Sequence, residues 1–187
     1  MDAKYPYDLF FAGQDHPRHG CKMIGDTGPH RRPVFYSFDT PIIATEQDAT
    51  TTVFNGTRNI ATLKWVAGNH LGSYQVEGMS RPNMMSYLYM VPNGEVDRSR
   101  GSLFQTASGR TYEWRKVRKP NEPLQYDLYP SGGGDAVGGY RRFSPPRQSA
   151  HAGLLYGTLT HNFDDDELML YALLALCINR WVDMNGL

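Results

Sequence analysis

A long apolar run near the C-terminus constrains the fold of this chain more than any other part of its sequence. Residues 168–178 read LMLYALLALCI and directly follow the acidic stretch from Asp164 to Glu167. Acidic residues stabilise the first turn of a helix, and Asp164 with Glu167 three residues later matches a capping box. No β-branched residue occurs before Ile178, so the run favours a helix over a strand. We therefore expect a helix over about residues 164–183.

This expected helix is apolar on every face, whereas a helix at a protein surface has a polar stripe. Its apolar run spans roughly 16 Å, which is much shorter than the ~30 Å hydrocarbon core of a bilayer. A transmembrane segment is therefore disfavoured, and we expect protein to surround the helix.

Most of the remaining chain reads as short strands separated by turn residues. Alternation is clearest where Ala61, Leu63 and Trp65 share one face, which is typical of a sheet that buries one side. Asn55-Gly56 and Ser108-Gly109 each predict a hairpin, because glycine accepts the positive φ angles of a tight turn. The expected strands are residues 34–38, 51–54, 59–66, 71–76, 84–91, 102–106, 111–117, 124–129, 137–143 and 154–160.

Ten or more strands without intervening helices predict a sandwich or a closed barrel. The sheet itself is the natural surround for the apolar helix, so we expect an all-β fold with one C-terminal helix inside a curved sheet. A length of 187 residues fits one domain. We expect it over residues 33–187, after an N-terminal arm over residues 1–32. In that arm, alternation from Tyr5 to Phe11 predicts a first strand, and the His, Gly, Pro and Arg of residues 13–32 predict a long loop.

The amino-acid composition disfavours several classes of protein. The formal net charge is zero, from 19 basic and 19 acidic residues, which argues against nucleic-acid binding through bulk charge. Two cysteines, Cys21 and Cys177, do not support a disulfide framework and suit a reducing compartment. The first residues lack the pattern of a secretory signal, so we expect a cytoplasmic protein. Peripheral binding at a membrane is compatible with this expectation.

Four segments of the sequence form a familiar pattern when taken in order. They are NIATLKW at 59–65, SGRTYEWR at 108–115, YRRF at 140–143 and the helical run at 166–181. Together they resemble the tubby C-terminal-like superfamily, which includes phospholipid scramblases and plant LURP-one-related proteins, and they are most similar to a fungal family of unknown function assigned to it. The resemblance implies a barrel of about twelve antiparallel strands around a central hydrophobic helix. It supplies no catalytic residues, although some superfamily members bind phosphoinositides or act at membranes.

Two basic runs are the candidate ligand-binding site. If the barrel brings them together, their side chains could hold the phosphates of a lipid headgroup. The alternative is a set of solvated strand ends whose charge is balanced by Glu113, Glu122 and Asp127. The candidate residues are Arg115, Lys116, Arg118 and Lys119 in the first run and Arg141, Arg142 and Arg147 in the second.

A metal site is disfavoured. His16, His19, Cys21 and His30 have ligand-capable side chains, but a zinc site usually takes four ligands in two tight pairs. Only His16, His19 and Cys21 are closely spaced, so we expect a disordered arm and no metal or other cofactor.

Two further patterns have structural explanations. Gly132-Gly133-Gly134 lacks the Gly-Lys-Ser/Thr of a phosphate loop and predicts a turn. The Met-rich and Tyr-rich residues 84–90 could line an adaptable apolar pocket, but ordinary packing explains them as well.

Catalysis is the weaker functional hypothesis. His161 lies close to Asp164–Asp166, and a His–Asp pair can act as a general base, but a helix cap already explains the acidic residues. No Gly-x-Ser-x-Gly, His-Glu-x-x-His or paired-cysteine motif is present. We therefore favour a non-enzymatic binding or adaptor domain whose partner is anionic lipid or a membrane surface. The alternatives are an enzyme or small-ligand carrier with a pocket at one barrel end, and a protein–protein interaction module using the N-terminal arm.

Overall fold

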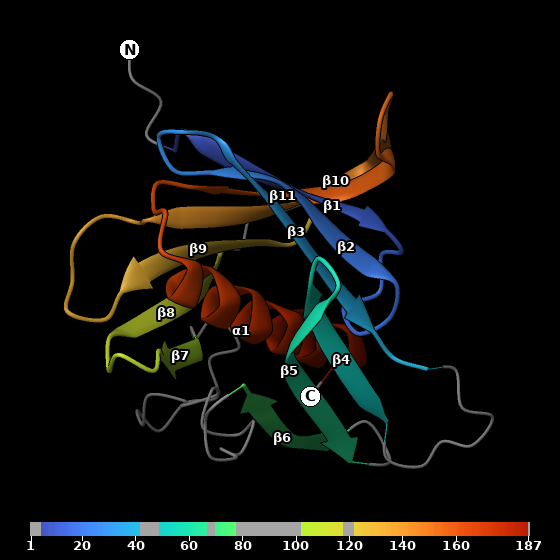
Figure 1. Ribbon diagram of the computed structural model, residues 1–187. Coiled ribbons are helices and arrows are strands. Elements are labelled where there is room, and N and C mark those ends of the chain that lie inside the picture. Colours follow the sequence, from blue (N-terminus) through green and yellow to red (C-terminus); the bar gives the residue numbers. More distant parts are fainter. Residues whose placement is uncertain (1–4, 42–48, 67–69, 78–101, 118–121, 187) are drawn as a thin grey trace.

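The computed structural model describes residues 5–41, 49–66, 70–77, 102–117 and 122–186 (Figure 1). These residues form a mostly antiparallel β structure with one C-terminal helix, as the sequence predicts. The strands are β1 (Tyr7–Gly13), β2 (Cys21–Thr27), β3 (Arg32–Asp39), β4 (Thr50–Asn55), β5 (Arg58–Val66), β6 (His70–Val76), β7 (Ser102–Gln105), β8 (Thr111–Val117), β9 (Gln125–Pro130), β10 (Gly138–Ser149) and β11 (Gly153–His161), and the helix is α1 (Asp166–Asn185).

Within the described residues, the 11 strands form one sheet in the order β6-β5-β4-β3-β2-β1-β11-β10-β9-β8-β7. Most strands pair with their neighbours in sequence. The exception is the pairing of β1 with β11, which joins the first and last strands in the middle of the sheet. Strands β6 and β7 are the two edges, and Figure 1 shows the sheet curving around α1 between them.

Alternating side chains determine which face of the sheet meets the helix. In β5, Ala61, Leu63 and Trp65 are at most 3% exposed, whereas Lys64 and Val66 are exposed. Both hairpin predictions are confirmed, because β4 pairs with β5 across Gly56 and β7 pairs with β8 across Gly109. The φ angles of these glycines are 60° and 84°, in the left-handed region that favours glycine.

The helix α1 lies in the concave side of the sheet (Figure 1). Every residue from 171 to 181 is buried, so protein surrounds three successive turns as the apolar sequence predicts. Strands far apart in the sheet reach the helix. Trp114 of β8 donates its indole N–H to the Ala172 carbonyl at 3.0 Å, and Trp65 of β5 lies 5.5 Å from Trp181 between ring centroids. No helix in the described part of the chain is long and apolar enough to cross a membrane.

The predicted helix cap is wrong by one residue. Asp165 is the N-cap, and its carboxylate accepts a hydrogen bond from the Leu168 N–H at 3.0 Å. Glu167 does not close a capping box with Asp164, because its carboxylate accepts the Ser108 backbone N–H at 2.6 Å. At the other end, Gly186 takes the left-handed conformation that terminates the helix.

The prediction of a continuous loop over residues 13–32 is also wrong. Strand β2 lies within that segment and pairs with β1 on one side and β3 on the other. Gly25 allows the close approach of β1, because a Cβ at this position would lie 2.0 Å from the Asp8 carbonyl oxygen. Strand β10 continues six residues beyond its expected end at Phe143. The expected strand over residues 84–91 lies outside the described residues.

Candidate binding surfaces

Most of the predicted basic site consists of paired cations. Arg118 and Lys119 lie outside the described residues, four of the other five candidates contact a carboxylate, and Arg147 does not. Paired charges of this kind hold neighbouring strands and loops together and leave little free charge for a ligand. The ion pairs are Arg115 with Glu113, Lys116 with Asp183, Arg141 with Asp127 and Arg142 with Asp15.

These four cations also point to two different sides of the sheet. The Arg115 guanidinium lies 4.3 Å from the ring centroid of Tyr129 on the outer face, away from the helix. Arg141 is on the same outer face, whereas Lys116 reaches Asp183 of α1 on the inner face. Arg142 pairs at the end of the sheet with Asp15, which also binds α1. The described candidates therefore do not all lie in one patch, because Arg115 and Arg141 share the outer face beside Asp127 whereas Lys116 and Arg142 do not.

A buried ionic network surrounds the C-terminal turns of α1. Arg180 is 6% exposed and donates to the Asp15 carboxylate at 3.0 Å. Its guanidinium carbon lies 5.5 Å and 5.3 Å from the ring centroids of Phe11 and Tyr140. Burial disfavours the Arg180 charge, but Tyr140, Cys21 and Asp15 outweigh that effect and raise its pKa. Arg180 is therefore a permanent cation held at the end of the sheet by Asp15.

The β1–β2 loop, residues 14–20, packs on the same end of α1. The Cys177 thiol donates to the Pro17 carbonyl at 3.1 Å, and the His16 ring lies 5.7 Å from the Trp181 ring. Cys21 is buried beside Arg180, while His19 contacts the Thr40 carbonyl oxygen at 2.6 Å. His16, His19 and Cys21 thus contact three different partners, and the described residues contain no group of three or more metal-binding side chains.

Arg18 in this loop has an unusual environment. Its guanidinium carbon lies 3.5 Å from the ring centroid of Trp181 and 4.9 Å from that of Trp65. Arg18 Nε and Trp181 Nε1 are both buried without a hydrogen-bond partner. No acidic side chain among the described residues pairs with Arg18. Nothing in the sequence around Arg18 distinguishes it from the other arginines, so sequence reasoning missed it.

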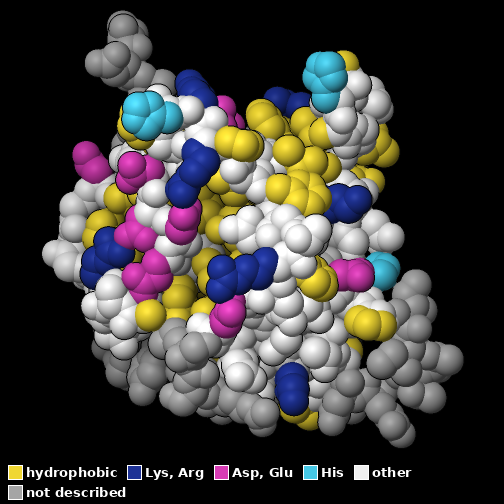
Figure 2. All heavy atoms as spheres, viewed as in Figure 1, with side chains coloured by type: hydrophobic (Ala, Val, Ile, Leu, Met, Phe, Trp, Pro, Cys, Tyr) yellow, Lys and Arg dark blue, Asp and Glu magenta, His cyan; other side chains and the backbone are white. Residues whose placement is uncertain are grey.

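The outer face of the central strands carries large apolar side chains. Phe10, Ile24 and Phe35 stand opposite one another on β1, β2 and β3, and Phe10 and Phe35 are each 38% exposed. Leu154 on β11 is 46% exposed. Figure 2 shows hydrophobic side chains gathered on the upper part of this face, with Lys and Arg side chains at their margin. We call this surface the outer strip, and its residues are Phe10, Ile24, Phe35, Phe143, Leu154 and Tyr156.

Two cations that make no ion pair with any described residue lie near the outer strip. Arg147 is exposed, lies 4.1 Å over the Phe143 ring, and makes no ion pair with the described residues. Lys22 is exposed on the same face of β2 as Ile24. The β10–β11 hairpin that carries Arg147 projects beyond its neighbours (Figure 1), and residues 136–163 contain no Asp or Glu. This acid-free run is a sequence signal that could have identified the region.

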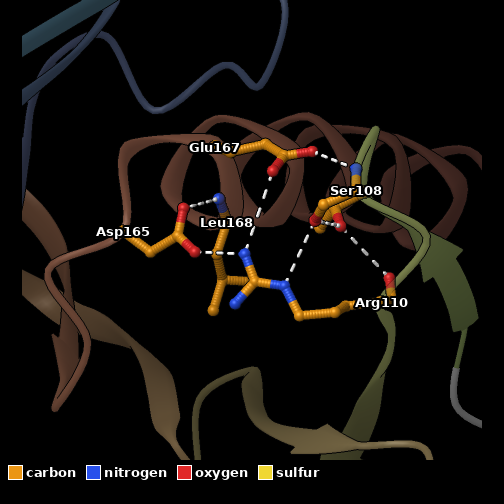
Figure 3. A network of polar contacts seen from close by, with 6 residues as sticks. Ser108, Arg110, Asp165, Glu167 and Leu168 are labelled. Atoms are coloured by element: carbon orange, nitrogen blue, oxygen red, sulfur yellow. Dashed lines mark hydrogen bonds and ion pairs between the residues drawn. The ribbon is translucent and has the colours of Figure 1, made fainter.

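The opposite end of α1 is a structural junction. Figure 3 shows Arg110 of the β7–β8 turn donating to the carboxylate of Asp165, and it also pairs with Glu167 at 3.8 Å. Arg110 also donates to the Ser108 hydroxyl at 3.2 Å. On another side of the helix, Arg32 of β3 makes two hydrogen bonds to Asp166. The acidic residues at this end therefore all have structural partners except Asp164, whose side chain is exposed and unpaired among the described residues.

His161 does not form the His–Asp pair considered for catalysis. Its side chain is fully buried, and Nδ1 lies 2.8 Å from the Phe163 carbonyl oxygen. Its Nε2 has no partner, and burial lowers the pKa of the ring to about 4. Since Asp165 and Asp166 bind Arg110 and Arg32, no carboxylate of the cluster orients His161 as a base.

Comparisons with protein-family models, with curated proteins and with solved structures found no match for this chain.

Proposed function

We propose that this chain is a non-enzymatic binding domain that docks on the surface of an anionic membrane through the outer strip. One observation carries the proposal: the cross-strand row of Phe10, Ile24 and Phe35 on β1–β3, together with the apolar side chains of the outer strip on β10 and β11, lies near cations that make no ion pair with the described residues. Exposed apolar side chains can enter the boundary between the lipid headgroups and the acyl chains of a membrane. Each nearby Lys or Arg adds about 1 kcal/mol of attraction to an anionic leaflet.

The charge distribution supports a lipid surface as the partner. Arg147 and Lys22 flank the strip, and Arg141 stands opposite Thr158 in the same cross-strand row as Phe10. Arg115 lies farther out on this face, whereas Lys116 and Arg142 are directed elsewhere by Asp183 and Asp15. The proposed site therefore keeps Arg115, Arg141 and Arg147 from the predicted candidates and adds Lys22.

The resemblance to the tubby C-terminal-like superfamily agrees with this role, because some of its members act at membranes. It also supports a finer architecture, in which the sheet closes around α1 as a barrel. Both edge strands already reach the helix or its core. Asn179 of α1 donates to the Ser102 hydroxyl of β7, and Tyr74 of β6 is buried in the same hydrophobic cluster.

Co-sedimentation with vesicles tests the proposal. The protein should bind phosphatidylcholine vesicles that contain phosphatidylserine, bind phosphatidylcholine alone weakly, and lose affinity as salt rises. Arg147→Gln should weaken binding by about fivefold, which corresponds to the attraction of one cation near the surface. Phe35→Ser should also weaken binding without changing the unfolding temperature, because Phe35 is exposed.

The matched control is Arg58→Gln. Arg58 is an exposed arginine on β5 that pairs with Glu77, so its loss should leave vesicle binding unchanged. Equal binding to neutral and anionic vesicles, or no binding at low salt, would refute the proposal. Sedimentation showing a dimer that Phe35→Ser dissociates would instead assign the strip to a second copy of the chain.

A further inference from the structure

The backbone holds Arg18 and its two tryptophans in fixed positions. The Arg18 carbonyl accepts the Thr40 hydroxyl at 2.7 Å, and the Arg18 N–H donates to His16 Nδ1 at 3.3 Å. Thr40 also contacts the Thr51 hydroxyl at 2.7 Å, and Thr51 accepts the Trp65 indole N–H at 2.8 Å. This chain of hydrogen bonds aligns Trp65 with the loop, so the stacked arrangement is built into the fold.

The stacked guanidinium lacks hydrogen-bond acceptors. Aromatic faces attract a cation but accept none of its in-plane N–H groups, and a partly buried charge without acceptors is costly. The hydrogen bonds of Arg18 all involve its backbone, so its guanidinium donors have no acceptor among the described residues. The Trp181 indole N–H, in a side chain only 3% exposed, is a second unused donor in the same stack.

Nearby acidic groups are already engaged. Asp15 binds Arg180 and Arg142, and Asp39 lies 3.5 Å from His19. Burial, followed by the charge of Arg18, lowers the pKa of His16, which leaves that ring neutral. Among the described residues, the end of the sheet around Arg18 therefore has more cations than carboxylates, and its unused donors come from two side chains that contact each other.

We propose that Arg18 and Trp181 form a binding site for an oxyanion, the phosphate or carboxylate group of a small ligand. The guanidinium fork and the indole N–H would donate to its oxygens, while Trp65 and Trp181 hold the fork in place. Arg18 is partly exposed, so a small anion would approach from the solvent-facing side of its guanidinium, and the loop would have to shift for the anion to reach the buried Arg18 Nε and Trp181 Nε1. This site is separate from the outer strip, because it lies on the β1–β2 loop over the end of α1.

Nuclear magnetic resonance reports both donors directly. The chain has three tryptophans, and Trp→Phe variants would assign their indole N–H signals. Inorganic phosphate should shift the Trp181 indole and Arg18 Nε–H signals in a saturable way. The Trp114 indole N–H, which is bound to the Ala172 carbonyl, should not move and is an internal reference. A parallel titration with acetate distinguishes a site for any oxyanion from one selective for phosphate.

Arg18→Gln should weaken phosphate binding by about tenfold or more, as expected when a charge-assisted hydrogen bond is lost. Arg18→Lys keeps the charge but loses the planar fork, so it should bind more weakly than the wild type. Arg58→Gln is the control and should bind phosphate normally. If phosphate causes only the linear shift that sodium chloride of equal ionic strength causes, or if Arg18→Gln binds like the wild type, the proposal is wrong.

The same variants separate this site from membrane docking. Arg18→Gln should remain on phosphatidylserine vesicles, and Arg147→Gln should still show the saturable phosphate shift. If Arg18→Gln loses both vesicle binding and the phosphate-induced shift, Arg18 binds a lipid headgroup, and the assignment to a small soluble ligand is wrong. If the wild type does not bind vesicles but still shows the saturable phosphate shift, the membrane proposal is wrong and the oxyanion site stands.

Discussion

At the scale of single residues, His161 shows how burial changes an ionisable group. Its ring lies 5.4 Å from Tyr7 and 4.7 Å from Phe163 between centroids, and burial lowers its pKa to about 4. The pKa in the unfolded chain is about 6.5, so the unfolded state binds the proton more tightly. The stabilisation by the neutral ring is complete above pH ~6.5 and is lost as the pH falls toward the folded-state value.

We therefore expect the titration of His161 to lower the free energy of unfolding by about 3 kcal/mol as the pH falls from 7 to 4. Urea unfolding across this range measures it, and His161→Phe should show a correspondingly smaller loss than the wild type. The control is His151→Phe, which alters an exposed histidine and should follow the wild-type pH dependence. Equal pH dependence of His161→Phe and wild type would contradict the buried neutral ring.

Single-residue predictions from sequence succeeded where only local alternation was needed. Ala61, Leu63 and Trp65 face the core because the strand period alone determines their side. The partners of Arg142 and Arg180 could not be predicted, because both bind Asp15 across more than a hundred residues of sequence. Such pairs depend on how β1 and β11 meet in the sheet, and periodicity does not reveal that pairing.

At the scale of elements, the N-terminus of α1 links the helix to a hairpin. Asp165 caps the helix through the Leu168 N–H and also binds Arg110 (Figure 3). Burial acts to raise the pKa of Asp165, but the hydrogen bonds from Arg110 and the Leu168 N–H outweigh it and lower the pKa. The carboxylate is therefore charged at neutral pH and serves both partners.

Asp165→Ala should lower the free energy of unfolding by about 1 kcal/mol, the typical cost of losing an N-cap side chain. Asp164→Ala is the matched control, since Asp164 is exposed and does not cap the helix, and it should have little effect. Chemical denaturation of both variants measures the difference. A larger loss of unfolding free energy for Asp164→Ala than for Asp165→Ala would show that Asp164 is the N-cap, as the sequence predicted.

Two elements show why strand prediction failed in part. Strand β2 lies in a segment rich in His, Gly, Pro and Arg, and this composition obscured the short alternation of Cys21 and Met23. Strand β10 contains Pro145 and Pro146, which normally end a strand. They fall where the pairing with β11 shifts between Arg142 and Arg147, so their missing N–H groups do not interrupt the ladder.

At the scale of the whole molecule, contacts at both ends of α1 join distant parts of the sheet. Arg32 and Arg110 bind the acidic N-terminus from β3 and from the β7–β8 turn. At the other end, Asp15 and Lys116 reach the helix from the β1–β2 loop and from β8. The helix is therefore the element that the central strands share, and we expect sheet and helix to unfold together.

Leu174→Asp tests this dependence. Leu174 is completely buried near the middle of α1, and an unpaired carboxylate there costs several kcal/mol, comparable with the whole stability of a typical domain. We expect the variant to lose its near-ultraviolet circular dichroism and its cooperative thermal transition. Met184→Asp is the control, because Met184 is 50% exposed on the same helix and should retain both signals. A Leu174→Asp protein with wild-type unfolding behaviour would mean that the sheet stands without the helix as its core.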